Sequence, residues 1–103
     1  VKVVPERVEA ALEPLLRQAG FGGRFFVWGL PDERLGQRLT AVLEGTPISG
    51  NGLETVRRKA EETLTRFEVP RGWEFLEIFP ETATGKIDKP RVVEFLTHRA
   101  END

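Results

Sequence analysis

The stretch RFFVWGLPDERLGQRLTAVLE, residues 24–44, determines the expected fold of the chain. Residues 24–30 are rich in aromatic and β-branched side chains, which is typical of a buried strand. Residues 31–37 are polar and predict a turn, and residues 38–44 predict a second strand. Because the connection is short, the two strands are expected to pair as an antiparallel hairpin.

Helical patterns flank this hairpin on both sides. Before it, apolar residues recur at helical spacing from Pro5, and Gly20 is expected to end the helix. Pro14 lies inside this pattern and is expected to kink or split it. After the hairpin, residues 53–67 predict a second helix, with Asn51 and Glu54 as a capping pair. Its expected apolar stripe consists of Leu53, Val56, Ala60, Leu64 and Phe67.

The C-terminal third predicts a strand, a polar loop and a helix. Residues 73–79 carry apolar side chains on both faces, which indicates either coverage on both sides or a bulge. Residues 80–88 are polar, and a last helix is expected from about Pro90 with Asp88 as its cap. Its inward-facing residues are expected to be Val92, Phe95 and Leu96. Residues 1–4 could add a short edge strand. The predicted fold class is α+β, a small mixed or antiparallel three-stranded sheet covered by about three helices.

Composition argues against several classes of function. The 103 residues fit a single domain, and the absence of Cys removes disulfides and thiolate metal sites. The 15 basic and 17 acidic residues are interspersed and give a pI of about 5.5, which argues against a nucleic-acid partner. A lone His98, expected at the solvated surface, offers no metal site, so the predicted metal is none. No apolar run is long enough to span a membrane, and a cytoplasmic location is expected.

One short motif could carry chemistry, the Gly-Lys pair in Thr82-Ala83-Thr84-Gly85-Lys86. A phosphate-binding P-loop requires a Gly five residues before this Gly and a Ser or Thr after the Lys. Position 80 is Pro and Ile87 follows Lys86, so this is not a P-loop. Taken alone, the motif predicts an ordinary polar turn with a solvated lysine.

Four stretches, in order, resemble the C-terminal domain of the acyl-adenylate-forming ligases. This superfamily includes acyl-CoA synthetases, adenylation domains of peptide synthetases and firefly-type luciferases. The stretches are Val3–Glu9 after the interdomain hinge, the Gly29–Gln37 hairpin turn, Leu64–Pro70, and Phe79–Lys89 with the family's catalytic lysine. The resemblance covers nearly all of residues 1–103 and implies a single mobile lid domain whose N-terminal partner domain is missing. The start at Val1 rather than Met agrees with that expectation. Residues 22–27 are similar to those of some bacterial o-succinylbenzoate–CoA ligases of menaquinone synthesis.

The resemblance implies an ATP-dependent carboxylic acid–CoA ligase. Lys86 would be catalytic in forming the acyl adenylate, and Thr82, Thr84 and Gly85 would form the substrate- and nucleotide-facing loop. ATP, CoA and Mg²⁺ would serve the full-length enzyme, with none expected on this fragment, which alone would be inactive. Two alternatives stay open, a peptide-synthetase adenylation domain that loads a carrier protein and a non-catalytic interaction module. The acyl substrate and the oligomeric state are not predicted.

Overall fold

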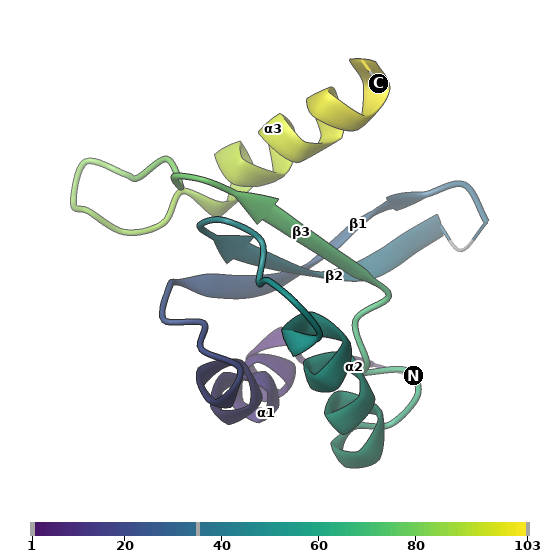
Figure 1. The fold of residues 1–103 in the computed structure, drawn as a ribbon. Coiled ribbons are helices and arrows are strands. Elements are labelled where there is room, and N and C mark those ends of the chain that lie inside the picture. Colours follow the sequence, from purple (N-terminus) through teal and green to yellow (C-terminus); the bar gives the residue numbers. More distant parts are fainter. Residues whose placement is uncertain (1, 35, 103) are drawn as a thin grey trace.

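The computed structural model describes residues 2–34 and 36–102, with the side chain of Asn102 excepted. Within them the elements follow the order α1 (Pro5–Gln18), β1 (Phe25–Asp32), β2 (Gly36–Glu44), α2 (Gly52–Thr63), β3 (Gly72–Leu76) and α3 (Lys89–Asn102). Figure 1 shows α1 and α2 on one face of the sheet and α3 on the other. The predicted α+β class is confirmed.

The sheet has the order β1-β2-β3 and is mixed. Strands β1 and β2 form the predicted antiparallel hairpin, from the pair Phe25 and Leu43 to the pair Asp32 and Gly36. Both strands therefore run further into the predicted turn than expected, and Leu35 of that turn lies outside the described residues. Pro31 has no N–H to donate to a neighbouring strand. It is tolerated in β1 because β1 is an edge strand, with a neighbouring strand on one side only.

Strand β3 pairs parallel to β2 and is shorter than predicted. Trp73 and Phe75 pack toward the α1 and α2 side, whereas Leu76 packs toward α3. Coverage on both faces therefore explains the apolar pattern. The chain bends after Leu76, so Ile78 is 74% exposed while Phe79 is buried.

Each face of the sheet has its own apolar core. The α1 and α2 side contains the larger buried cluster: Val8, Leu12, Leu16, Phe21, Val27, Ala41, Leu43, Val56 and Ala60. The α3 side contains a smaller one: Phe26, Val42, Phe79, Val92 and Leu96. The alternation of β1 and β2 places neighbouring residues, such as Phe26 and Val27, in different cores.

Helix α1 begins at Pro5 and ends as predicted before Gly20, which has φ +88°. The N–H groups of Gly20 and Phe21 donate to the carbonyls of Arg17 and Leu16, which closes the helix end. Pro14 does not split this helix, which is continuous across it.

Helix α2 differs from the prediction at both ends. Asn51 precedes it but makes no side-chain cap hydrogen bond, so the predicted capping pair is wrong. The helix stops at Thr63, and Phe67 is 49% exposed rather than part of the apolar stripe. The side chain of Glu68 accepts the Thr65 N–H at 3.1 Å. Such a local bond competes with helix continuation, which explains the early end.

Helix α3 begins where predicted, and Asp88 caps it by accepting the Arg91 N–H at 3.2 Å. Val92 and Leu96 are buried, but Phe95 is 52% exposed, so its inward orientation was wrongly predicted. The predicted edge strand is wrong for residues 2–4, which are not in a strand, and Val1 lies outside the described residues. No helix in the described part of the chain is both long and apolar enough to cross a membrane.

Candidate functional site

Residues 80–88 form a small hairpin, here called the lysine hairpin, which projects from the domain between β3 and α3 (Figure 1). Glu81 and Ile87 pair across it in an antiparallel bridge. The Thr82 N–H donates to the Lys86 carbonyl at 2.8 Å, and the Asp88 N–H donates to the Pro80 carbonyl at 2.9 Å. The segment predicted as a polar loop thus forms a hairpin held by backbone hydrogen bonds.

The tip of the lysine hairpin is a tight turn that depends on Gly85. The Gly85 N–H donates to the Thr82 carbonyl at 3.0 Å, and Gly85 has φ +84°. This is the left-handed region, which Gly adopts without a Cβ penalty. The Thr82 Oγ1 accepts the Lys86 N–H at 3.3 Å and lies 3.1 Å from the Thr84 Oγ1. The structure therefore brings Thr82, Thr84, Gly85 and Lys86 together, with the threonines shaping the turn.

Lys86 is presented to solvent at this tip. Its side chain is exposed, and among the described residues its ammonium has no ion pair or hydrogen bond. Lys86 precedes the bridged residue Ile87, so its side chain lies on the face of the hairpin opposite Glu81 and Ile87. The result is an uncompensated positive charge on the outer face of a hairpin.

The base of the lysine hairpin is anchored in the smaller core. Phe79 is 2% exposed, and Ile87 packs against the same cluster. The ring of Phe79 meets that of Phe26 edge to face at 5.5 Å. The two ends of the hairpin are therefore fixed by apolar packing, and its tip remains accessible.

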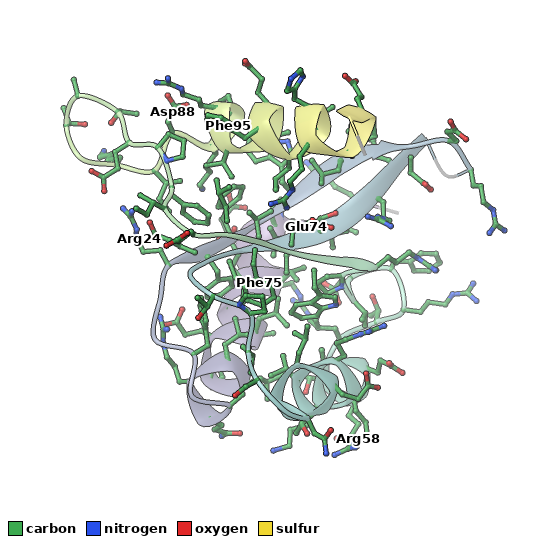
Figure 2. All side chains as sticks on the ribbon, turned by 45° about the horizontal axis from the view of Figure 1, so that its top comes forward. Arg24, Arg58, Glu74, Phe75, Asp88 and Phe95 are labelled. Atoms are coloured by element: carbon green, nitrogen blue, oxygen red, sulfur yellow. The ribbon has the colours of Figure 1, made fainter. Side chains whose placement is uncertain are left out.

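Arg24, immediately before β1, adds a charged anchor at the same base (Figure 2). Its guanidinium donates to both carboxylate oxygens of Glu44 and to Glu81, each at 2.8 Å. The Phe79 N–H also donates to Glu44, at 2.8 Å. These bonds hold the pKa of Glu44 below its usual value, with the Arg24 bond the largest cause, and raise the pKa of Arg24.

The sequence reasoning missed Arg24, Glu44 and Glu81. A signal existed for the first pair, since residues 24 and 44 are the first and last residues of the two predicted strands and face each other once the hairpin register is known. Opposite charges at facing positions are a common cross-strand pair. The contact of Arg24 with Glu81 joins residues distant in sequence and has no such local signal.

A second feature is the arginine groove, a surface hollow lined by Arg38, Arg66, Phe67, Val69 and Arg71, among others. Its volume is about 560 Å³, and it adjoins a hollow of about 490 Å³ that shares Arg66, Val69 and Arg71. Among the described residues, no ion pair links the guanidiniums of Arg38, Arg66 and Arg71 to a carboxylate. Glu61 lines the adjoining hollow.

The arginine groove combines cations with an apolar and aromatic surface. The Arg66 guanidinium lies 4.8 Å from the centre of the Phe67 ring. The Arg71 N–H donates to the Leu39 carbonyl at 2.9 Å, which fixes this residue beside β2. One guanidinium can donate to two phosphate oxygens at once. An exposed aromatic ring such as that of Phe67 can stack on a nucleotide base. The groove is therefore suited to a nucleotide that carries phosphates.

Within the described residues, no three His, Asp or Glu side chains come together as a metal site. His98 lies on α3 and is exposed, as expected for a surface position.

Comparisons with known proteins identify relatives of the chain, although no family model matches it. It is 33% identical over 89% of its length to the 3-[(3aS,4S,7aS)-7a-methyl-1,5-dioxo-octahydro-1H-inden-4-yl]propanoyl:CoA ligase of Mycobacterium tuberculosis. It is 34% identical over 88% of its length to a probable 2-succinylbenzoate–CoA ligase of the same species. The chain spans 17% and 23% of these two relatives.

A solved structure agrees with these relatives. The acyl-CoA synthetase (AMP-forming)/AMP-acid ligase II-like protein of Dyadobacter fermentans matches 93% of this chain with a TM-score of 0.83 and 28% identity. The match covers 27% of that structure. The chain therefore belongs to the AMP-forming acyl-CoA ligases and corresponds to a small part of their length.

Proposed function

We propose that residues 1–103 form the C-terminal, mobile lid domain of a cytoplasmic ATP-dependent acid–CoA ligase, in which Lys86 promotes adenylation. The full enzyme would join a carboxylic acid to ATP and release pyrophosphate, and would then transfer the acyl group from AMP to CoA. The observation that carries this proposal is the uncompensated Lys86 ammonium at the exposed tip of an anchored hairpin.

The chemistry explains why a lysine is needed there. In adenylation a carboxylate attacks the α-phosphate of ATP, so two anions approach each other. A positive charge between them offsets the repulsion and stabilises the charge that develops in the transition state. Lysine supplies a compact charge on a flexible stem, and a hairpin tip can bring it into a site formed by another domain.

The rest of the active site would come from the remainder of the enzyme. The chain spans only 17–23% of the length of its two relatives in Mycobacterium tuberculosis, which supports a large N-terminal domain in the complete protein. That domain would hold the acyl pocket and the ATP phosphates, and the ATP would bring the Mg²⁺ ion. We therefore expect residues 1–103 alone to be inactive.

The arginine groove supports CoA as the acceptor of the acyl group. CoA carries phosphates and an adenine base, and the groove offers guanidiniums beside an exposed Phe67 ring. We propose that the lid rotates between the two half-reactions, so that Lys86 serves adenylation and the arginine groove serves thioester formation. One relative is named for 2-succinylbenzoate, so this acid is the first substrate to test.

The test is a product analysis of the complete ligase with ATP, 2-succinylbenzoate or other carboxylic acids, and CoA. We expect AMP, pyrophosphate and acyl-CoA in equal amounts. Arg71→Ala should raise the KM for CoA and leave acid-dependent pyrophosphate release unchanged, whereas Lys59→Ala, on the exposed surface of α2, should change neither. Release of ADP, or acyl transfer to a carrier protein but not to CoA, would contradict the proposal.

A further inference from the structure

Arg24 connects the lysine hairpin to the end of the sheet through a fork of charged hydrogen bonds. Its Nε and Nη2 donate to the two oxygens of Glu44, and its Nη1 donates to Glu81, each at 2.8 Å. Glu44 also accepts the N–H of Phe79, the residue that leads into the hairpin. A planar guanidinium bound on two sides has few alternative orientations, so it fixes the angle between its partners.

The position of Glu81 on the hairpin determines what this contact controls. Glu81 and Ile87 are bridge partners, so their side chains share one face of the hairpin. Ile87 turns that face toward the smaller core, and Arg24 binds Glu81 on the same face. Lys86, which precedes Ile87, then lies on the opposite, outer face of the hairpin. Arg24 therefore binds the face of the hairpin opposite Lys86 and does not touch Lys86 itself.

This contact is better suited to positioning than to stability. The side chains of Arg24 and Glu81 are 39% and 46% exposed, and exposed ion pairs contribute little to folding. The smaller core and the backbone bonds of the hairpin remain when the pair is removed. What is lost is the bond that fixes the face of the hairpin against the sheet.

We propose that Arg24, through its bond to Glu81, is a positioning residue that directs Lys86 toward the reacting groups. This inference rests on the adenylation role proposed for Lys86. Displacing a catalytic group by about 1 Å can lower the rate by about 10²-fold. A loosened hairpin still held by its core packing should displace Lys86 less than this, so we expect the adenylation rate to fall by about tenfold.

The test is Glu81→Ala in the complete ligase, which leaves the bonds of Arg24 to Glu44 in place. The matched control is Glu74→Ala. It removes the 3.1 Å ion pair between Glu74 of β3 and Arg99 of α3, neither of which belongs to the hairpin. Two rates are measured, acid-dependent pyrophosphate release and thioester formation from synthetic acyl adenylate and CoA. Glu81→Ala should slow the first by about tenfold, mainly in kcat, and leave the second unchanged. Glu74→Ala should change neither rate.

A double variant separates positioning from a general structural role. In the Lys86→Ala background, Glu81→Ala should have no further effect on pyrophosphate release, because the residue it positions is gone. An equal effect in both backgrounds, or equal effects of Glu81→Ala and Glu74→Ala, would overturn the inference. If Lys86→Ala alone left adenylation at the parental rate, the proposed function itself would be wrong, and this inference with it.

Discussion

Glu44 is the residue at which the end of β2 meets the lysine hairpin. Its carboxylate has a lowered pKa, first because Arg24 donates to it and also because the Phe79 N–H does. The folded state therefore binds a proton at this site more weakly than the unfolded chain does. The stability that Glu44 contributes is present above the ordinary value of 4.5 and is lost as the pH falls through the lower folded pKa.

We therefore expect the free energy of unfolding of residues 1–103 to fall in acid, and to fall less steeply in Glu44→Gln. The pKa of Glu68 is lowered too, mainly by the Thr65 N–H, so the variant should keep part of the acid dependence. Urea unfolding at a series of pH values below neutrality measures both slopes. An identical pH dependence in the two proteins would show that Glu44 is not held as described.

Gly85 allows a second test at the scale of one residue. A Cβ there would meet no atom within 4 Å, so the cost of Gly85→Ala comes from φ +84° alone. An L-residue in this region costs about 1–2 kcal/mol. Gly22→Ala is the matched control, since that Cβ also meets nothing and the backbone is not in the left-handed region. Thermal unfolding should show a lower Tm for Gly85→Ala only. Equal Tm values would mean that the hairpin turn is not part of the cooperative fold.

At this scale the sequence predicted the site unevenly. Lys86, Thr82, Thr84 and Gly85 were found because they lie within one five-residue stretch that resembles a family motif. Their common location at a hairpin tip is consistent with that prediction, whereas the catalytic role of Lys86 remains to be tested. The anchors Arg24 and Glu81 are 57 residues apart, and only the folded chain brings them together.

At the scale of elements, helices α2 and α3 each follow a polar residue, but only one of these residues caps its helix. Asp88 caps α3 by accepting the Arg91 N–H, whereas Asn51 makes no such bond before α2. Loss of a bonded N-cap costs about 1 kcal/mol. Asp88→Ala should therefore lower the free energy of unfolding by about that amount, and Asn51→Ala should change it little. Chemical denaturation of both variants measures the difference, and equal losses would contradict the cap assignment.

The elements themselves were largely predictable, because apolar periodicity and Gly and Pro positions mark them. The errors lie at ends decided by local hydrogen bonds or by tertiary packing. Glu68 takes the Thr65 N–H and ends α2 early, so Phe67 leaves the helix for the arginine groove. Phe95 was expected in the core by its spacing, but Val92, Val93 and Leu96 already fill the contact between α3 and the sheet.

At the scale of the whole molecule, the sheet separates two apolar cores that stabilise different parts of the domain. The larger core, under α1 and α2, holds the sheet, and the smaller one, under α3, anchors the ends of the lysine hairpin. The parallel pairing of β3 with β2 could not be derived from the sequence, because each strand's pattern fits either direction. β3 ends at Leu76, and the chain then bends and enters the lysine hairpin.

The placement of the two candidate sites also belongs to this scale. The lysine hairpin follows β3, and the arginine groove includes Arg71, just before β3 begins. A rotating lid with two such sites could present one in each half-reaction. This arrangement supports the proposed division of labour between adenylation and thioester formation.

The most direct test of this account is Lys86→Ala in the complete ligase, with the two half-reactions measured separately. Acid-dependent pyrophosphate release should fall by about 10²–10³-fold, the usual loss when one electrostatic donor to a developing anion is removed. Thioester formation from synthetic acyl adenylate and CoA should stay near the parental rate, because the proposed rotation of the lid would turn Lys86 away in that step. Lys89→Ala is the control, since its ammonium lies 5.6 Å from the centre of the Phe26 ring rather than at the hairpin tip. Equal slowing of both half-reactions by Lys86→Ala would contradict the account.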